Sequence, residues 1–110
     1  MRYCLALDLK NDAQLIAEYE QWHKEVWPEI KRSITDGGIT DMEIYRLEDR
    51  LFMIMETDPA FSFERKAAMD EANPAVSRWE ELMWKYQSVI PGGHAGEKWR
   101  VMEKIFGLRS

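Results

Sequence analysis

A tyrosine and a histidine four residues apart, Tyr19 and His23, are the side chains of this sequence best suited to chemistry. Residues with this spacing lie on the same face of a helix, so the two rings are expected to project together. The neighbouring apolar positions recur at helical spacing, which directs His23 towards the core or a cleft over it. Because histidine exchanges protons near neutral pH, the pair indicates general acid–base catalysis. The competing interpretation is a histidine hydrogen-bonded in the core or exposed beside the apolar stripe.

Other kinds of site find little support in the sequence. The histidines are His23 and His94, the single cysteine is Cys4, and no pair of them has the spacing of metal ligands. The nucleophile motif Gly-x-Ser-x-Gly of serine hydrolases is absent. The glycine-rich stretch 90–96 lacks the lysine of a phosphate-binding loop, so it is predicted to be a surface loop. The sequence therefore predicts neither a metal site nor a nucleotide cofactor.

Length and composition narrow the function classes further. The 110 residues predict a single domain over 1–110, with a net charge of −5. No basic stretch suggests nucleic acid or an anionic membrane as partner, and no apolar run is long enough for a membrane span. Asp8 interrupts the first apolar stretch too early for a signal peptide. With one cysteine available, these features favour a cytoplasmic protein whose ligand is a small molecule.

The elements that position the two rings can be read from breakers and periodicity. Helix starts are expected at Asp12, at Pro28 and at Pro74, and the first helix is expected to run to Trp27. Gly37 and Gly38 mark the end of the second helical piece. A further helix is expected over 63–71, and the last helix is expected to reach residue 88. Strands are expected over 3–9, 39–46, 51–57 and 99–106. The resulting order of elements is β-α-β-β-α-β. This order predicts an α+β, ferredoxin-like fold, a four-stranded antiparallel sheet with helices on one face.

The strand over 51–57 is apolar on both faces. Residues Leu51, Met53 and Met55 alternate with Phe52 and Ile54, so the sheet face without helices is also apolar. The chain is too short to cover that face itself. We therefore expect a second subunit to cover it, which makes the protein a homodimer of the dimeric α+β barrel type. In the strand over 39–46, strict alternation places Ile39 on the same face as Asp41, Glu43 and Tyr45. It places Met42 on the opposite face.

The last helix presents aromatic rings near the predicted cleft. Trp79 is either a core residue or an apolar platform for the C–H face of a sugar ring. Glu80 and Glu81, which follow it, are solvated acids by default and could also bind sugar hydroxyl groups.

At these residues the chain resembles the L-rhamnose mutarotase family, small ferredoxin-like homodimers that interconvert the anomers of sugars. The pattern Tyr-x3-His-x3-Trp-Pro-Glu, beginning at Tyr19, carries most of the resemblance, and an arginine–tryptophan pair ending at Trp79 supports it. The resemblance implies that His23 is the proton donor and that Tyr19 and Trp79 contact the sugar. The family's second tryptophan is Glu80 here, and a sugar-contacting tyrosine is replaced by Met42, with the aromatic Tyr45 nearby.

The stretches 41–46 and 61–66 resemble the branch of L-fucose mutarotases, so L-fucose and L-rhamnose are both candidate substrates. The implied reaction opens and closes a cyclic hemiacetal by acid–base catalysis and requires no cofactor. The group that acts with His23 stays open among bound water and the side chains of Tyr19, Asp41, Glu43 and Glu56. The rival functions for such a fold are a haem-degrading or quinone-forming monooxygenase and a binding or interaction module.

Overall fold

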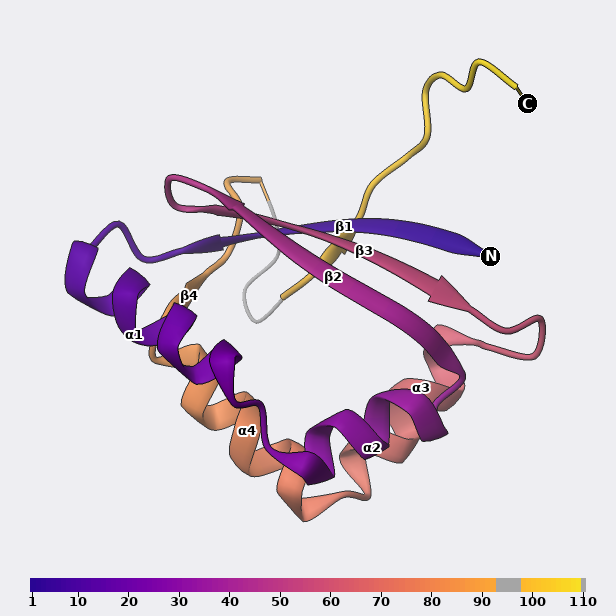
Figure 1. Cartoon of the computed structure of the whole chain (residues 1–110), viewed down its shortest axis with the longest axis horizontal. Helices are drawn as coiled ribbons and strands as arrows, with labels where there is room; N and C mark the ends of the chain where they lie inside the picture. Colours follow the sequence, from indigo (N-terminus) through magenta and orange to yellow (C-terminus); the bar gives the residue numbers. More distant parts are fainter. Residues whose placement is uncertain (93–97, 110) are drawn as a thin grey trace.

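The computed structural model describes residues 1–92 and 98–109 (Figure 1). Its strands are β1 (Arg2–Leu9), β2 (Ile39–Leu47), β3 (Arg50–Thr57), β4 (Gln87–Ser88) and β5 (Arg100–Val101). Its helices are α1 (Ala13–Lys24), α2 (Pro28–Asp36), α3 (Phe63–Glu71) and α4 (Pro74–Trp84). None of these helices is long and apolar enough to cross a lipid bilayer. His94 and most of the predicted loop over 90–96 lie outside the described residues.

The strands form one antiparallel sheet in the order β2-β3-β1-β4, and β5 also pairs with β1. Figure 1 shows the four helices gathered on one side of this sheet. The predicted α+β, ferredoxin-like arrangement is therefore confirmed. The inner face, towards the helices, receives Leu5, Leu7 and Leu9 from β1 and Leu51, Met53 and Met55 from β3, all of them buried.

The predicted strand over 99–106 is wrong in length, because only Arg100–Val101 pairs as a strand. Val101 lies opposite Leu5 and Arg100 opposite Ala6. Just beyond this pair, the N–H group of Met102 still donates a hydrogen bond to the carbonyl oxygen of Cys4, at 2.7 Å. The fourth strand position is instead divided between β4, beside the end of β1, and β5, beside its middle.

Two helices end earlier than predicted. Asp12 caps α1 by accepting hydrogen bonds from the backbone N–H groups of Gln14 and Leu15, both at 3.0 Å, as the sequence suggests. The helix ends at Lys24 rather than Trp27, since the residue before a proline is driven into an extended conformation and Trp27 has ψ 136°. In α4 the helix ends at Trp84, because the following residues turn back to pair with β1.

A β-bulge between Ile39 and Asp41 changes which residues of β2 face the helices. Ile39 is buried opposite Thr57, whereas Asp41 is exposed. The expectation that Ile39 shares a face with Asp41 is therefore wrong: the bulge adds one residue, so Ile39 joins Met42 and Ile44 on the inner face. Those three side chains pack into the apolar cluster between β1, β3 and the helices.

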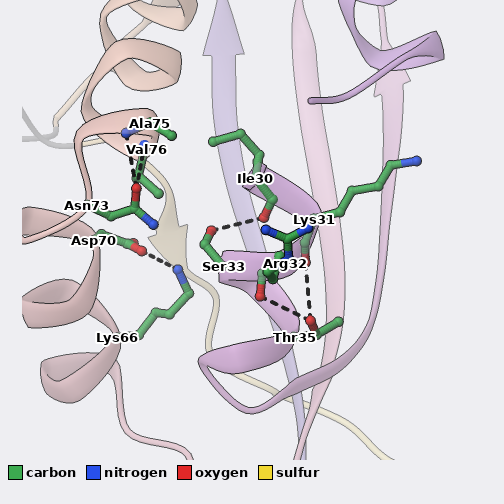
Figure 2. Close-up of polar contacts among 10 residues, drawn as sticks. All are labelled: Ile30, Lys31, Arg32, Ser33, Thr35, Lys66, Asp70, Asn73, Ala75 and Val76. Atoms are coloured by element: carbon green, nitrogen blue, oxygen red, sulfur yellow. Dashed lines mark hydrogen bonds and ion pairs between the residues drawn. The ribbon is translucent and has the colours of Figure 1, made fainter. Parts of the chain in front are cut away.

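The start of α4 depends on Asn73, whose side-chain Oδ1 accepts hydrogen bonds from the N–H groups of Ala75 (3.0 Å) and Val76 (3.5 Å) (Figure 2). Replacing an N-cap asparagine with alanine removes these acceptors and lowers the free energy of unfolding by about 0.5–2 kcal/mol. We therefore expect Asn73→Ala to unfold at a lower urea concentration than the wild type. The matched control is Asn11→Ala, at an exposed position outside the helices. Equal stability of the two variants would contradict the capping role.

Candidate functional site

Helix α1 brings Tyr19 and His23 into contact. Their ring centroids are 4.2 Å apart, and the ring planes are tilted by 35°. The Nδ1 atom of His23 lies 2.8 Å from the carbonyl oxygen of Tyr19, one helical turn earlier. A carbonyl oxygen only accepts hydrogen bonds, so Nδ1 must carry the hydrogen. In the neutral imidazole this leaves Nε2 with a free lone pair, which is the form of a general base.

The surroundings of His23 favour that neutral form. Burial lowers the pKa of His23 below its ordinary value of 6.5, while the hydrogen bond to the Tyr19 carbonyl opposes the change. The ring of Trp79 meets the imidazole edge-on at 5.7 Å and itself contacts Trp27 at 5.0 Å. This aromatic packing removes water from the imidazole and holds its orientation.

Tyr19 is buried and keeps its proton at neutral pH. Burial raises the pKa of its hydroxyl to about 12, the negative charge of Glu80 adds to the rise, and a hydrogen bond from Gln87 opposes it. The phenol is therefore a hydrogen-bond donor beside a neutral imidazole. One group can take a proton while the other gives one.

A cavity of about 500 Å³ lies between the helices and the inner face of the sheet. This volume is within the range of about 300–1,000 Å³ typical of small-molecule sites. The structure brings five of the six predicted site residues to its wall: Tyr19, Met42, His23, Trp79 and Glu80. Much of the remaining wall is apolar, with Val26, Ile44, Met53 and Met55 among its members. A ligand held here would meet apolar surface with polar groups at a few points.

Tyr45 is the predicted site residue that the structure leaves out of this cavity. It lies opposite Phe52 on the outer face of the sheet and is 53% exposed. Its hydroxyl group donates a hydrogen bond to Glu43, at 3.2 Å. Tyr45 instead lines a second pocket, of about 420 Å³, which it shares with Tyr19 and His23. Contact between Tyr45 and a sugar therefore stays a prediction.

Glu80 is held in place by a lysine from the far end of the chain. The Nζ atom of Lys98 forms an ion pair with the Glu80 carboxylate and lies 3.3 Å from its backbone carbonyl oxygen. The same ammonium group lies 4.6 Å from the ring centroid of Trp84. Where the family pattern has a second tryptophan, this chain thus has a carboxylate that is already paired.

The structure also narrows the choice of a proton partner for His23. Asp41 and Glu43 are exposed, Glu56 pairs with Arg2 at 2.7 Å, and none of these three lines the cavity. Tyr19 does line it, next to His23. Among the candidate side chains named from the sequence, Tyr19 is the one in position to act.

Some polar residues of the cavity were missed by sequence reasoning. Ser33 lines it from α2, and Lys66 and Asp70 do so from α3, where they form an ion pair with each other (Figure 2). Gln87 is 5% exposed, and its Oε1 has no hydrogen-bond partner among the described residues. Leaving a buried acceptor unpaired costs about 1–3 kcal/mol. No sequence signal pointed to Gln87, which stands between Tyr86 and Ser88 at the end of a stretch expected to be helical.

Comparison with known proteins gives a consistent result. The family model described as L-rhamnose mutarotase matches residues 2–108. An L-fucose mutarotase of Xanthomonas campestris pv. campestris is 47% identical over 97% of this chain and 87% of its own length. A UPF0734 protein of Dictyostelium discoideum is 38% identical over 96% of this chain and 88% of its own. The crystal structure of an L-rhamnose mutarotase from Formosa agariphila superposes with a TM-score of 0.72 at 19% identity, covering 98% of both chains, which supports the fold.

The lowered pKa of His23 predicts how the ring titrates. In an NMR titration the His23 ring protons, assigned by their loss in His23→Gln, should show a midpoint below 6.5. The unfolded chain then binds this proton more readily than the folded one. Stability contributed by the group is therefore complete above pH 6.5 and falls as the pH drops towards the folded midpoint. A midpoint at or above 6.5 would contradict the burial argument.

Proposed function

The chain belongs to the L-rhamnose mutarotase family, and from that premise we propose that it interconverts the α and β anomers of L-fucose. The observation that carries the proposal is the neutral His23, with Nε2 unprotonated, on the wall of a cavity large enough for a monosaccharide. The relative named as an L-fucose mutarotase, at 47% identity, favours this sugar over L-rhamnose. Both sugars are 6-deoxy-L-hexoses, and the apolar wall offers a place for their C6 methyl group.

The reaction can be written with the residues of the cavity. Nε2 of His23 takes the proton of the anomeric hydroxyl group, the O1–C1 bond becomes a carbonyl, and the bond from C1 to the ring oxygen breaks. The hydroxyl of Tyr19 gives its proton to the departing ring oxygen. After rotation about C1–C2, the phenolate takes that proton back as the ring closes, and the imidazolium returns its proton to O1. His23 is thus the base in opening and the proton donor in closing.

Several features support this pairing of roles. The two rings are in contact, so one sugar can reach both. The pKa of about 12 keeps Tyr19 protonated until negative charge develops on the ring oxygen, which then takes the proton from the phenol. The anchored Nδ1 of His23 keeps the imidazole from turning its N–H towards the sugar. Trp79 supplies an apolar face for the C–H side of the pyranose.

We also propose that two copies of the chain associate through the outer face of the sheet. Cys4 and Ala6 of β1 and Phe52 and Ile54 of β3 form an apolar strip there that no helix covers (Figure 1). The C-terminal segment leaves the body of the molecule, and its Ile105, Phe106 and Leu108 are 92%, 77% and 88% exposed. The strip is partly exposed and the C-terminal residues are highly exposed, and together they favour a second copy as the occupant. Its sheet would lie on the strip, with the C-terminal segments of both copies at the interface.

The compartment proposed for this activity is the cytoplasm. The support is the sequence argument that Cys4, the single cysteine, has no internal partner for a disulfide. A free thiol is stable in a reducing compartment.

The activity is tested by NMR saturation transfer between the anomers of L-fucose and, separately, of L-rhamnose. We expect the protein to accelerate anomer exchange, more for L-fucose. His23→Ala should lose most of the acceleration, by about 10²–10⁴-fold, because general acid–base catalysis contributes that much. The control is Lys24→Ala, at the exposed neighbouring position. A folded protein that accelerates neither sugar would sink the proposal and leave haem binding, detected by a Soret band, as the next assay.

The dimer is tested by placing a charge on the apolar strip. Ile54→Lys should give a monomer in sedimentation equilibrium, because an ammonium group cannot be buried unpaired in an apolar interface. The matched control is Ser77→Lys, which adds the same charge on an exposed position of α4. A wild-type chain that sediments as a monomer, or an Ile54→Lys dimer as tight as the control, would refute this interface.

A further inference from the structure

Gln87 is a buried polar residue with an unused hydrogen-bonding atom. It is 5% exposed, it lines the cavity together with Tyr19 and His23, and its Oε1 has no partner among the described residues. Buried polar atoms of native proteins are nearly always partnered, so each exception asks for an explanation. A ligand in the cavity is the natural source of the missing donor.

The backbone fixes the direction of this side chain. In β4, Gln87 lies directly opposite Leu9 of β1, and residues opposite each other in an antiparallel pair point to the same face. Leu9 belongs to the buried cluster on the inner face, so Gln87 points there too. A backbone hydrogen bond from Lys10 to the carbonyl oxygen of Tyr86, at 2.8 Å, holds the strand in this register. Gln87 therefore cannot satisfy its Oε1 by turning towards solvent.

The other end of the amide acts on Tyr19. The interaction with Gln87 lowers the pKa of the phenol, which is the effect of a donor near the phenolic oxygen. The NH₂ group of Gln87 is the donor of this amide, so it is the end that has this effect. The hydroxyl of Tyr19 keeps its own hydrogen free to donate, and Oε1 of Gln87 keeps both of its lone pairs.

We propose that Gln87 is a substrate-binding residue, which accepts a hydrogen bond from a ring hydroxyl group of the sugar through Oε1. The inference rests on the proposed mutarotase function and deepens it. An acceptor at this place selects a hydroxyl group of the sugar, since the ring oxygen has no hydrogen to donate. Gln87 would thereby tie the position of the sugar to the position of the proton donor, without exchanging a proton itself.

The first test is Gln87→Met, which keeps the length of the side chain and removes its polar atoms. The apparent affinity for L-fucose, taken from the concentration dependence of anomer exchange, should fall about five- to tenfold, the effect of one lost hydrogen bond. The control is Gln21→Met, the same exchange at an exposed position of α1. The thermal midpoint should stay unchanged or rise, because the variant has no unpaired buried oxygen. A lower midpoint with unchanged affinity would mean a purely structural role and overturn the proposal.

The second test uses L-fucose analogues that lack one hydroxyl group, at C2, C3 or C4. The wild type should bind one of them markedly more weakly than L-fucose, and Gln87→Met should no longer distinguish that analogue from the parent sugar. If the variant discriminates among the analogues as the wild type does, Gln87 does not contact the sugar. Equal binding of all analogues by the wild type overturns the proposal without any variant. A wild type inactive on every sugar instead refutes the mutarotase function.

Discussion

The hydrogen bond between Nδ1 of His23 and the carbonyl oxygen of Tyr19, 2.8 Å long, is the interaction on which the rest of the site depends. It joins positions i and i+4, so it exists only while α1 remains helical up to His23. By occupying Nδ1 it determines which nitrogen can meet a substrate. The helix ends one residue after His23, at Lys24, and the extended Trp27 then leads into α2. The site therefore lies at the C-terminal end of α1, on the wall of the cavity between the helices and the sheet.

The same arrangement sets the protonation of both groups. Trp79 meets the imidazole of His23 edge-on and is itself packed against Trp27, and the cavity beside His23 is also lined by residues of the inner sheet face. Burial disfavours the charged forms of both residues, so it lowers the pKa of His23 and raises the pKa of Tyr19. His23 is thereby kept unprotonated and Tyr19 protonated, which gives a base and an acid at neutral pH within one apolar cavity. Neither ring has to carry a charge until the sugar reacts.

How much of this could be read from the sequence depends on the range of the interactions involved. Asp12, Pro28 and Asn73 act on their own neighbours, and the helix starts that they mark were predicted correctly. The shared face of Tyr19 and His23 followed in the same way from helical spacing. The β-bulge at Ile39, the short pairing of Val101 and the early end of α4 depend on the register against β1 and β3, which no local pattern reports. For that reason sequence reasoning did not find Gln87, whose place in the cavity depends on the pairing of β4 with β1.

The most direct test of the central claim is the pH dependence of the accelerated anomer exchange, measured at low L-fucose concentration beside the NMR titration of the His23 ring. At low substrate concentration the profile reports the ionisations of the free enzyme. If neutral His23 is the base, the acceleration is constant at neutral pH and declines in acid, with a midpoint equal to that of the ring and below 6.5. Acceleration that continues undiminished well below the ring's midpoint would contradict the account, because the imidazolium has no lone pair with which to take the anomeric proton.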